Sequence, residues 1–329
     1  MSGDTRRDVT IPWPVLPSSI PKAIPRTDYA RGVVYATAAG IALGTLGPLS
    51  NIAYAEGMGS PTFAALRATI GATALMAFLA ASHADRVPIR SLAQRDRVLL
   101  GLTAVAQAAL SLAVFAAYGA MAVAPVLAVY FSYPLLVAAA SIALGRERLT
   151  AVRALGLAIA LAGLVAVVLG GGSGAGRVTA IGVVLAGLAA ACQATYLVAS
   201  RSGFTRVPSQ QATGVILAAA AMIMWLVAWP AELTSSHPGS WMASPIAWIA
   251  AGVAGILGAA LAKVWMLRGV RRVGGTRAAV LMLAEPLTGV VLAAVLLGQG
   301  LTGAQVVGGI AVMTGALLAQ RPAPAADRR

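Results

Sequence analysis

Apolar residues in this chain gather into long blocks, and the length of these blocks limits the fold more than any other feature of the sequence. Each block holds about 18 to 25 residues, which as an α-helix matches the ~30 Å hydrocarbon core of a bilayer. Of the 329 residues, 59% are hydrophobic and only 10% are charged, whereas a soluble domain is about 25% charged. The sequence therefore predicts an all-α polytopic membrane protein.

Ten such blocks are separated by polar loops, and we expect each to be a transmembrane helix. They cover residues 30–54, 61–82, 98–120, 123–145, 151–170, 178–200, 210–230, 245–267, 276–298 and 302–320. The proline-rich residues 1–28 and the polar residues 321–329 read as cytoplasmic tails, the first of them disordered. The predicted organisation is a five-helix half over 29–170, a glycine-rich linker over 171–177 and a second half over 178–320.

Positive charges alternate between the loops. The net charge is +14, and 21 of the 24 Lys and Arg residues fall in the tails or in loops on their side, whereas Arg177 lies opposite. By the positive-inside rule this distribution predicts that both termini are cytoplasmic. The charge excess is thereby explained without nucleic acid as a partner.

The two halves share an internal repeat. Residues 124–169 align without a gap onto 276–321 at an offset of 152. The matched pairs are Pro134 with Pro286, Gly156 with Gly308 and Gly163 with Gly315. An odd number of helices in each half inverts the second half in the membrane. Inverted repeats are typical of alternating-access transporters, whose substrate site lies between the repeats near the midplane.

Glu285 lies close to the centre of the apolar block 276–298. A charged group in hydrocarbon costs a few kcal/mol or more, so we expect this carboxylate to bind substrate or couple transport. The alternative is a structural ion pair or a hydrogen bond between helices. Tyr133 occupies the equivalent place in the first half, so the repeat is chemically asymmetric there.

Pro134 and Pro286 follow these two residues directly. Each proline removes a backbone donor and leaves the carbonyl of Tyr130 or Met282 without its usual helical partner. We expect the pair to act as hinges; a kink that only shapes packing is the alternative.

Two cations fall inside predicted helices, Arg67 and Lys263. Each is separated from Glu285 by roughly 7 Å in membrane depth, so either could pair with it. Depth alone does not choose between them. Either side chain could instead extend along its helix to the nearer interface.

Polar side chains among small residues complete the predicted substrate site. Tyr130, Tyr133, Gln193 and Tyr196 can stack on an organic substrate or orient it with hydrogen bonds. The single cysteine, Cys192, excludes an internal disulfide, and His83 and His237 lie far apart in loops. We find no metal-ligand or nucleotide motif, so we expect no metal, no cofactor and no enzymatic activity.

These residues resemble the EamA-type transporters of the drug/metabolite transporter superfamily. The resemblance rests on Phe63-Ala-Ala-Leu-Arg67, on Ala124-Pro125 through Pro134, on Leu144-Gly-Arg-Glu147-Arg-Leu-Thr150, and on Glu285-Pro286-Leu287 followed by Leu297-Gly298-Gln299-Gly300-Leu301-Thr302. It implies two inverted EamA repeats of five helices around a central cavity. There are departures from the family pattern: Gln299 and Tyr133 stand where many members have glutamate, and Gln193 stands where an aromatic residue is common.

The resemblance implies a secondary transporter of a bacterial inner membrane, and we expect an exporter of amino acids or related metabolites that works by alternating access. The alternatives are a proton-coupled drug antiporter, an importer of a vitamin or nucleoside-like compound, and a lipid-handling membrane protein. The expected partners are a small-molecule substrate, the bilayer and, in a coupled carrier, protons. A homodimer is left open.

Overall fold

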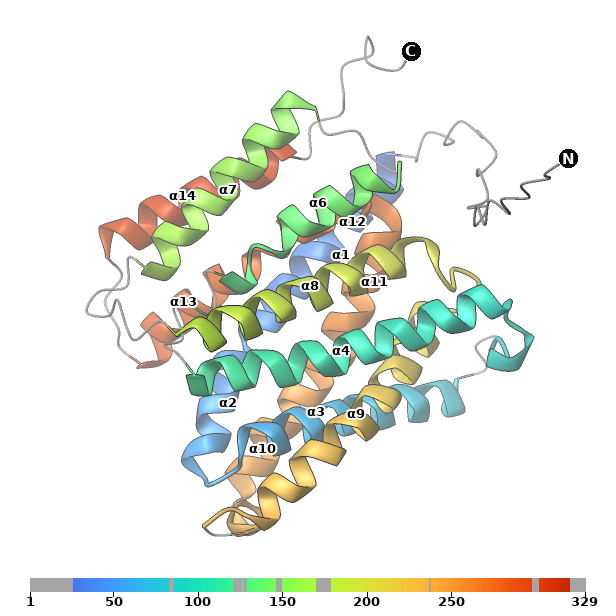
Figure 1. Ribbon diagram of the computed structural model, residues 1–329, viewed down its shortest axis with the longest axis vertical. Coiled ribbons are helices and arrows are strands. Elements are labelled where there is room, and N and C mark those ends of the chain that lie inside the picture. Colours follow the sequence, from blue (N-terminus) through green and yellow to red (C-terminus); the bar gives the residue numbers. More distant parts are fainter. Residues whose placement is uncertain are drawn as a thin grey trace, which may run out of the picture.

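All regular structure in the described residues is helical (Figure 1). The computed structural model describes residues 26–82, 86–120, 126, 129–145, 150–169, 179–236, 238–297 and 302–319. The helices of the first half are α1 (Arg26–Gly44), α2 (Leu46–Ala55), α3 (Ser60–Ala81), η1 (Ile89–Ser91), α4 (Gln94–Ala120), α6 (Tyr133–Ala143) and α7 (Ala151–Leu169). Those of the second half are α8 (Ala180–Ser202), α9 (Ser209–Leu233), η2 (Ser240–Ala243), α10 (Pro245–Val253), η3 (Ala254–Leu261), α11 (Ala262–Val273), α12 (Gly275–Leu281), α13 (Ala284–Leu297) and α14 (Gly303–Ala319).

Six helices in the described part of the chain are long and apolar enough to cross a membrane. They are Thr27–Ala55, Ser60–Ala81, Gln94–Val114, Ala180–Arg201, Ser209–Leu233 and Pro245–Val273. Three shorter apolar helices, Tyr133–Ala143, Ala151–Ala166 and Val306–Gly315, fall within other expected blocks. The chain is therefore a multi-pass membrane protein, while the full count of ten crossings stays a prediction. The expected linker and both tails lie outside the described residues, except that α1 begins at Arg26.

Four of the expected helices are not regular along their length. Thr45 separates α1 from α2, Phe131 and Ser132 form a turn before α6, and Met282 and Leu283 form a turn between α12 and α13. Hydroxyls contribute to two of these interruptions, because Thr45 Oγ1 donates to the Ala42 carbonyl (2.8 Å) and Ser132 Oγ to the Val129 carbonyl (2.7 Å). The fourth irregularity is η3, a π-helical stretch within the long helix that runs from α10 to α11.

Two pairs of equivalent helices, α7 with α14 and α3 with α9, pack against each other and run antiparallel. In the α7–α14 pair, a Cβ at Gly163 would lie 2.6 Å from the Gly308 carbonyl oxygen, and a Cβ at Gly315 would lie 2.5 Å from that of Gly156. Gly156 near the start of α7 thus meets Gly315 near the end of α14, and Gly163 near the end of α7 meets Gly308 near the start of α14. In lipid, small residues let helices approach this closely.

The α3–α9 pair shows the same direction. Thr62 Oγ1 donates to Glu232 at 2.6 Å, and Trp225 Nε1 donates to Thr69 Oγ1 at 3.0 Å. Other helix contacts also occur in equivalent pairs. α1 packs on α11, and its counterpart α8 packs on α4, the counterpart of α11. In the same way, α1 packs on α13 and α8 packs on α6. This pattern is that of two repeats related by inversion, as expected.

The two ends of the bundle differ in charge. At one end Arg271 donates to the carbonyls of Phe204 (3.1 Å) and Val207 (3.0 Å), and a surface pocket of about 500 Å³ is lined in part by arginines. At the other end Glu232 accepts hydrogen bonds from the Gly239 N–H and from Trp241 Nε1, both at 2.9 Å. The basic and acidic ends are therefore each built into the loops that connect the helices.

Candidate functional site

Glu285 lies at the second residue of α13, directly after the turn that separates this helix from α12. Its backbone N–H donates to the Met282 carbonyl at 2.9 Å. Pro286 removes the usual helical partner of this carbonyl, as expected, and the Glu285 N–H replaces that donor in the tighter turn. The turn positions the glutamate side chain in the interior of the bundle, partly buried.

Arg67 from α3 and Lys263 from α11 lie close enough to Glu285 for the three charges to interact. Among the residues that the structure describes, no hydrogen bond or ion pair within 4.0 Å joins either cation to the Glu285 carboxylate. The sequence left open which cation approaches the glutamate, and the structure brings both. The three groups form a charged cluster drawn from both halves, which we call the charge triad.

Lys263 does not extend to the membrane surface. Its side chain is buried, with 5% of the residue exposed, and its Nζ lies 5.0 Å from the centroid of the Tyr196 ring. A cation over an aromatic face is stabilised by the ring quadrupole, which compensates part of the lost hydration. The alternative of a lysine that reaches for the interface does not describe this structure.

The close approach of α3 to the π-helical η3 positions Arg67. A Cβ at Gly71 would lie 2.8 Å from the Gly255 carbonyl oxygen, and a Cβ at Gly255 would lie 3.0 Å from the Arg67 carbonyl oxygen. The backbones of α3 and η3 are therefore in close contact within one turn of Arg67. The π-helix also changes the helical register immediately before Lys263, and such bulges are frequent at functional sites.

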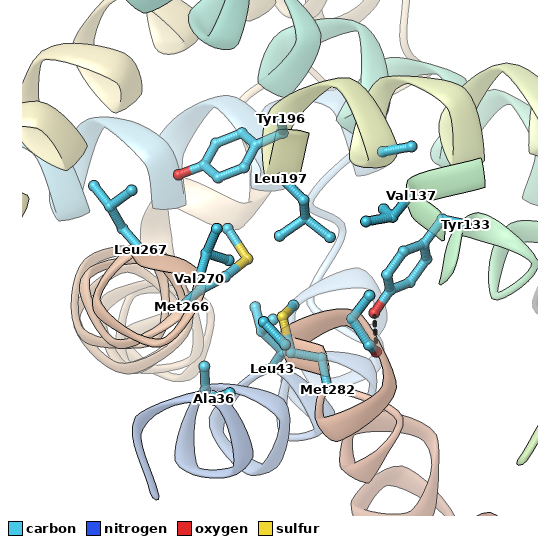
Figure 2. Close-up of a cluster of buried hydrophobic side chains, with 14 of the residues drawn as sticks. Ala36, Leu43, Tyr133, Val137, Tyr196, Leu197, Met266, Leu267, Val270 and Met282 are labelled. Atoms are coloured by element: carbon cyan, nitrogen blue, oxygen red, sulfur yellow. Dashed lines mark hydrogen bonds between the residues drawn. The ribbon is translucent and has the colours of Figure 1, made fainter. Parts of the chain in front are cut away.

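Tyr133 and Tyr130 form an aromatic wall beside the triad. Their ring centroids are 5.5 Å apart, and Tyr133 is fully buried. The Tyr133 hydroxyl donates to the Ala279 carbonyl of α12 at 3.4 Å (Figure 2). Tyr133 also lies within electrostatic reach of Glu285. Tyr133 and Glu285 occupy equivalent positions in the two repeats, so these equivalent residues lie close to each other in the interior.

Gln193 and Tyr196 of α8 contribute polar atoms on another side of the interior. Gln193 Nε2 lies 3.9 Å from Met266 Sδ, and Figure 2 shows Tyr196 beside the helix that carries Met266. Within the described part of the chain, Gln193 Oε1, the Tyr196 hydroxyl and Arg67 Nε are buried and lack a hydrogen-bond partner. A buried polar atom without a partner costs about 1–3 kcal/mol, so these atoms are suited to meet water or a ligand.

Pro134 and Pro286 are both buried, and each follows an interruption of its helix. Their proposed motion is not visible in one conformation, so the hinge role stays a prediction. Tyr54 of α2 was missed by the sequence reasoning, although it lies within electrostatic reach of Arg67. No group of His, Cys, Asp or Glu suited to hold a metal occurs among the described residues.

In addition to its repeat, its antiparallel helix pairs and its charged interior, the chain matches a known protein family. The sequence model of the EamA-like transporter family matches this chain twice, over residues 30–169 and 180–320. The chain belongs to the EamA-like transporter family. It is thus a membrane transporter of small molecules within the drug/metabolite transporter superfamily, as the resemblance of its motifs implied.

A comparison with solved structures supports the fold. One solved structure, described only as a crystal structure of a protein, superimposes with a TM-score of 0.72 at 24% sequence identity. The match covers 88% of this chain and 97% of the other, so the two share their architecture over nearly their whole lengths. No curated protein matches the sequence.

Proposed function

We propose that this EamA-family protein is a bacterial inner-membrane carrier that exports amino acids or related metabolites by alternating access. The observation that carries the proposal is the charge triad, in which Arg67 comes from the first half and Lys263 and Glu285 come from the second. Charged groups inside a membrane protein are expensive and mark substrate or ion pathways. A site between inverted repeats can face either side of the membrane as the halves rock.

Glu285 has the properties of a coupling group. Its carboxylate has neither a hydrogen bond nor an ion pair to any other described residue, and two cations are close to it. Such a carboxylate can accept a proton when the cations are engaged elsewhere and release it when they are free. Occupancy of the two cations by a substrate and protonation of Glu285 would then be linked, as a proton-coupled carrier requires.

The prolines supply a place for the conformational change. The helix is interrupted beside both Pro134 and Pro286, so movement of α6 and α13 need not break a continuous ladder of backbone hydrogen bonds. Both turns lie next to the side chains of the proposed site. In this proposal the termini are cytoplasmic, with the arginine-rich end of the bundle on the same side.

Transport measurements in proteoliposomes test the proposal through Glu285→Gln. We expect the proton-driven amino-acid flux of this variant to be at least tenfold lower than that of the wild type, while its melting temperature changes little. Glu56→Gln is the matched control, because Glu56 accepts a hydrogen bond from Ser244 Oγ at 2.7 Å in a loop at the acidic end. Wild-type flux of Glu285→Gln at every pH would contradict the role of this carboxylate.

A further inference from the structure

The charges of the triad do not balance. Arg67 and Lys263 supply two positive charges against the single negative charge of Glu285, with the phenols of Tyr54, Tyr130, Tyr133 and Tyr196 as the other titratable groups around them. With all three side chains ionised, one positive charge is left over in the interior. An uncompensated buried charge is strongly unfavourable, so a site of this kind favours a negatively charged occupant.

Hydrogen-bond donors of Arg67 and Lys263 are also available to a ligand. The buried Nε of Arg67 has no hydrogen-bond partner in the described residues, and the interaction found for Lys263 Nζ is with the face of the Tyr196 ring. A planar guanidinium presents paired donors that match the two oxygens of a carboxylate, and an ammonium adds a third donor from another direction. The combination suits a carboxylate held between α3 and α11.

We infer that the substrate is recognised through a free carboxylate, which Arg67 and Lys263 bind together, while Glu285 faces the substrate's amino group. This inference rests on the proposed function and names the chemical class that the same site accepts. A substrate with one carboxylate and no cationic group neutralises the leftover positive charge, whereas a zwitterionic amino acid pairs its carboxylate with the two cations and its ammonium group with Glu285 and leaves the net charge unchanged. A cationic substrate without a carboxylate adds to that charge and is rejected.

The surroundings of the triad restrict the rest of the substrate. The rings of Tyr130 and Tyr133 on one side and of Tyr196 on the other present apolar faces with few hydrogen-bonding atoms. Such walls suit an apolar or aromatic side chain. We therefore expect an amino acid with an apolar side chain to bind better than one with a charged side chain.

Binding to the full-length protein in detergent tests the inference independently of flux. The probes are L-leucine, L-leucinamide, which lacks the carboxylate, and 4-methylpentanoate, which lacks the amino group. We expect leucine to stabilise the protein against heat, the amide to bind at least tenfold more weakly, and 4-methylpentanoate to retain binding. Equal stabilisation by leucine and leucinamide, or stabilisation by neither leucine nor 4-methylpentanoate, would overturn the inference.

Variants then assign the carboxylate to its two cations. Arg67→Gln and Lys263→Met are each expected to weaken leucine and 4-methylpentanoate at least tenfold, and Arg67→Lys to restore part of the loss. Lys263→Met preserves the length and packing of the side chain on Tyr196 without its charge. Arg90→Gln is the matched control, because Arg90 is exposed in η1. Unchanged binding in both triad variants would place the carboxylate elsewhere.

The binding and flux measurements separate a failure of the carboxylate inference from a failure of the proposed export function. Selective binding of carboxylates without transport in proteoliposomes would contradict the proposed export of amino acids and leave the recognition intact. Transport of leucine and leucinamide at equal rates would support a carrier and contradict carboxylate recognition.

Discussion

The α7–α14 contact and the charge triad both join the two repeats, yet they treat the repeat in opposite ways. In the contact, Gly156 and Gly163 meet Gly315 and Gly308, so each half supplies the same residues at matching places. In the triad, Glu285 has Tyr133 as its equivalent, and the two positions have different chemistry. Symmetry is kept where the halves hold each other and lost where a ligand is proposed to bind.

The difference has a physical cause. A contact between two equivalent helices repeats itself across the axis that relates the halves, so one favourable residue pair is used twice. A small substrate with a carboxylate at one end and an amino group at the other has no such axis. A site that fits it must place cations and an acid unequally on the two halves.

The largest effect is expected from exchanging the unequal positions in the double variant Tyr133→Glu and Glu285→Tyr. The carboxylate then starts from α6, whereas Arg67 and Lys263 stay where they are. We expect amino-acid flux in proteoliposomes to fall about 100-fold, equivalent to about 2.7 kcal/mol in the transport barrier. Retained flux in the exchanged protein would show that the halves are interchangeable and would break the comparison.

A smaller effect is expected from filling the symmetric contact with Gly315→Ala. The added methyl group would lie 2.5 Å from the Gly156 carbonyl oxygen, which belongs to backbone and cannot rotate away. Overpacking of this kind costs about 1–3 kcal/mol, so the melting temperature should fall.

Gly187→Ala is the control for that substitution, since a Cβ at Gly187, within α8, meets no atom within 4 Å. Both changes gain about the same helix propensity, so the difference between them isolates the close contact. Equal melting temperatures for the two variants would mean that α7 and α14 do not depend on the glycine contact.

The smallest effect is expected from Tyr133→Phe. The variant keeps the aromatic ring in the wall beside Tyr130 and removes only the 3.4 Å hydrogen bond to the Ala279 carbonyl. A net hydrogen bond contributes about 0.5–1.5 kcal/mol, and a long one falls at the low end of that range. Leucine affinity should change less than threefold in the thermal-stability assay. A tenfold loss would make the hydroxyl a direct contact of the substrate and sharpen the asymmetry with Glu285.

Much of the site was predictable from sequence because its members break the local pattern of their surroundings. Glu285, Arg67 and Lys263 are charged groups in apolar blocks, and the cost of such groups in hydrocarbon singles them out without coordinates. Tyr54 was missed because a tyrosine near the end of an apolar block has no such cost and looks like an interfacial residue. The π-helix was missed for a related reason, since its run of alanine and glycine also suits an ordinary helix.

The sequence by itself determined the class of protein, the repeat, the inversion of the second half and the identity of the unusual charges. These follow from block lengths, a constant offset and the expected odd number of helices in each half, all of which are read from the chain in order. Only the tertiary structure decided that both cations approach Glu285, that Lys263 stays buried over Tyr196 and that equivalent glycines meet across the α7–α14 pair. Those outcomes depend on the rotation and register of each helix against its neighbours, and contacts between small residues far apart in the chain determine both.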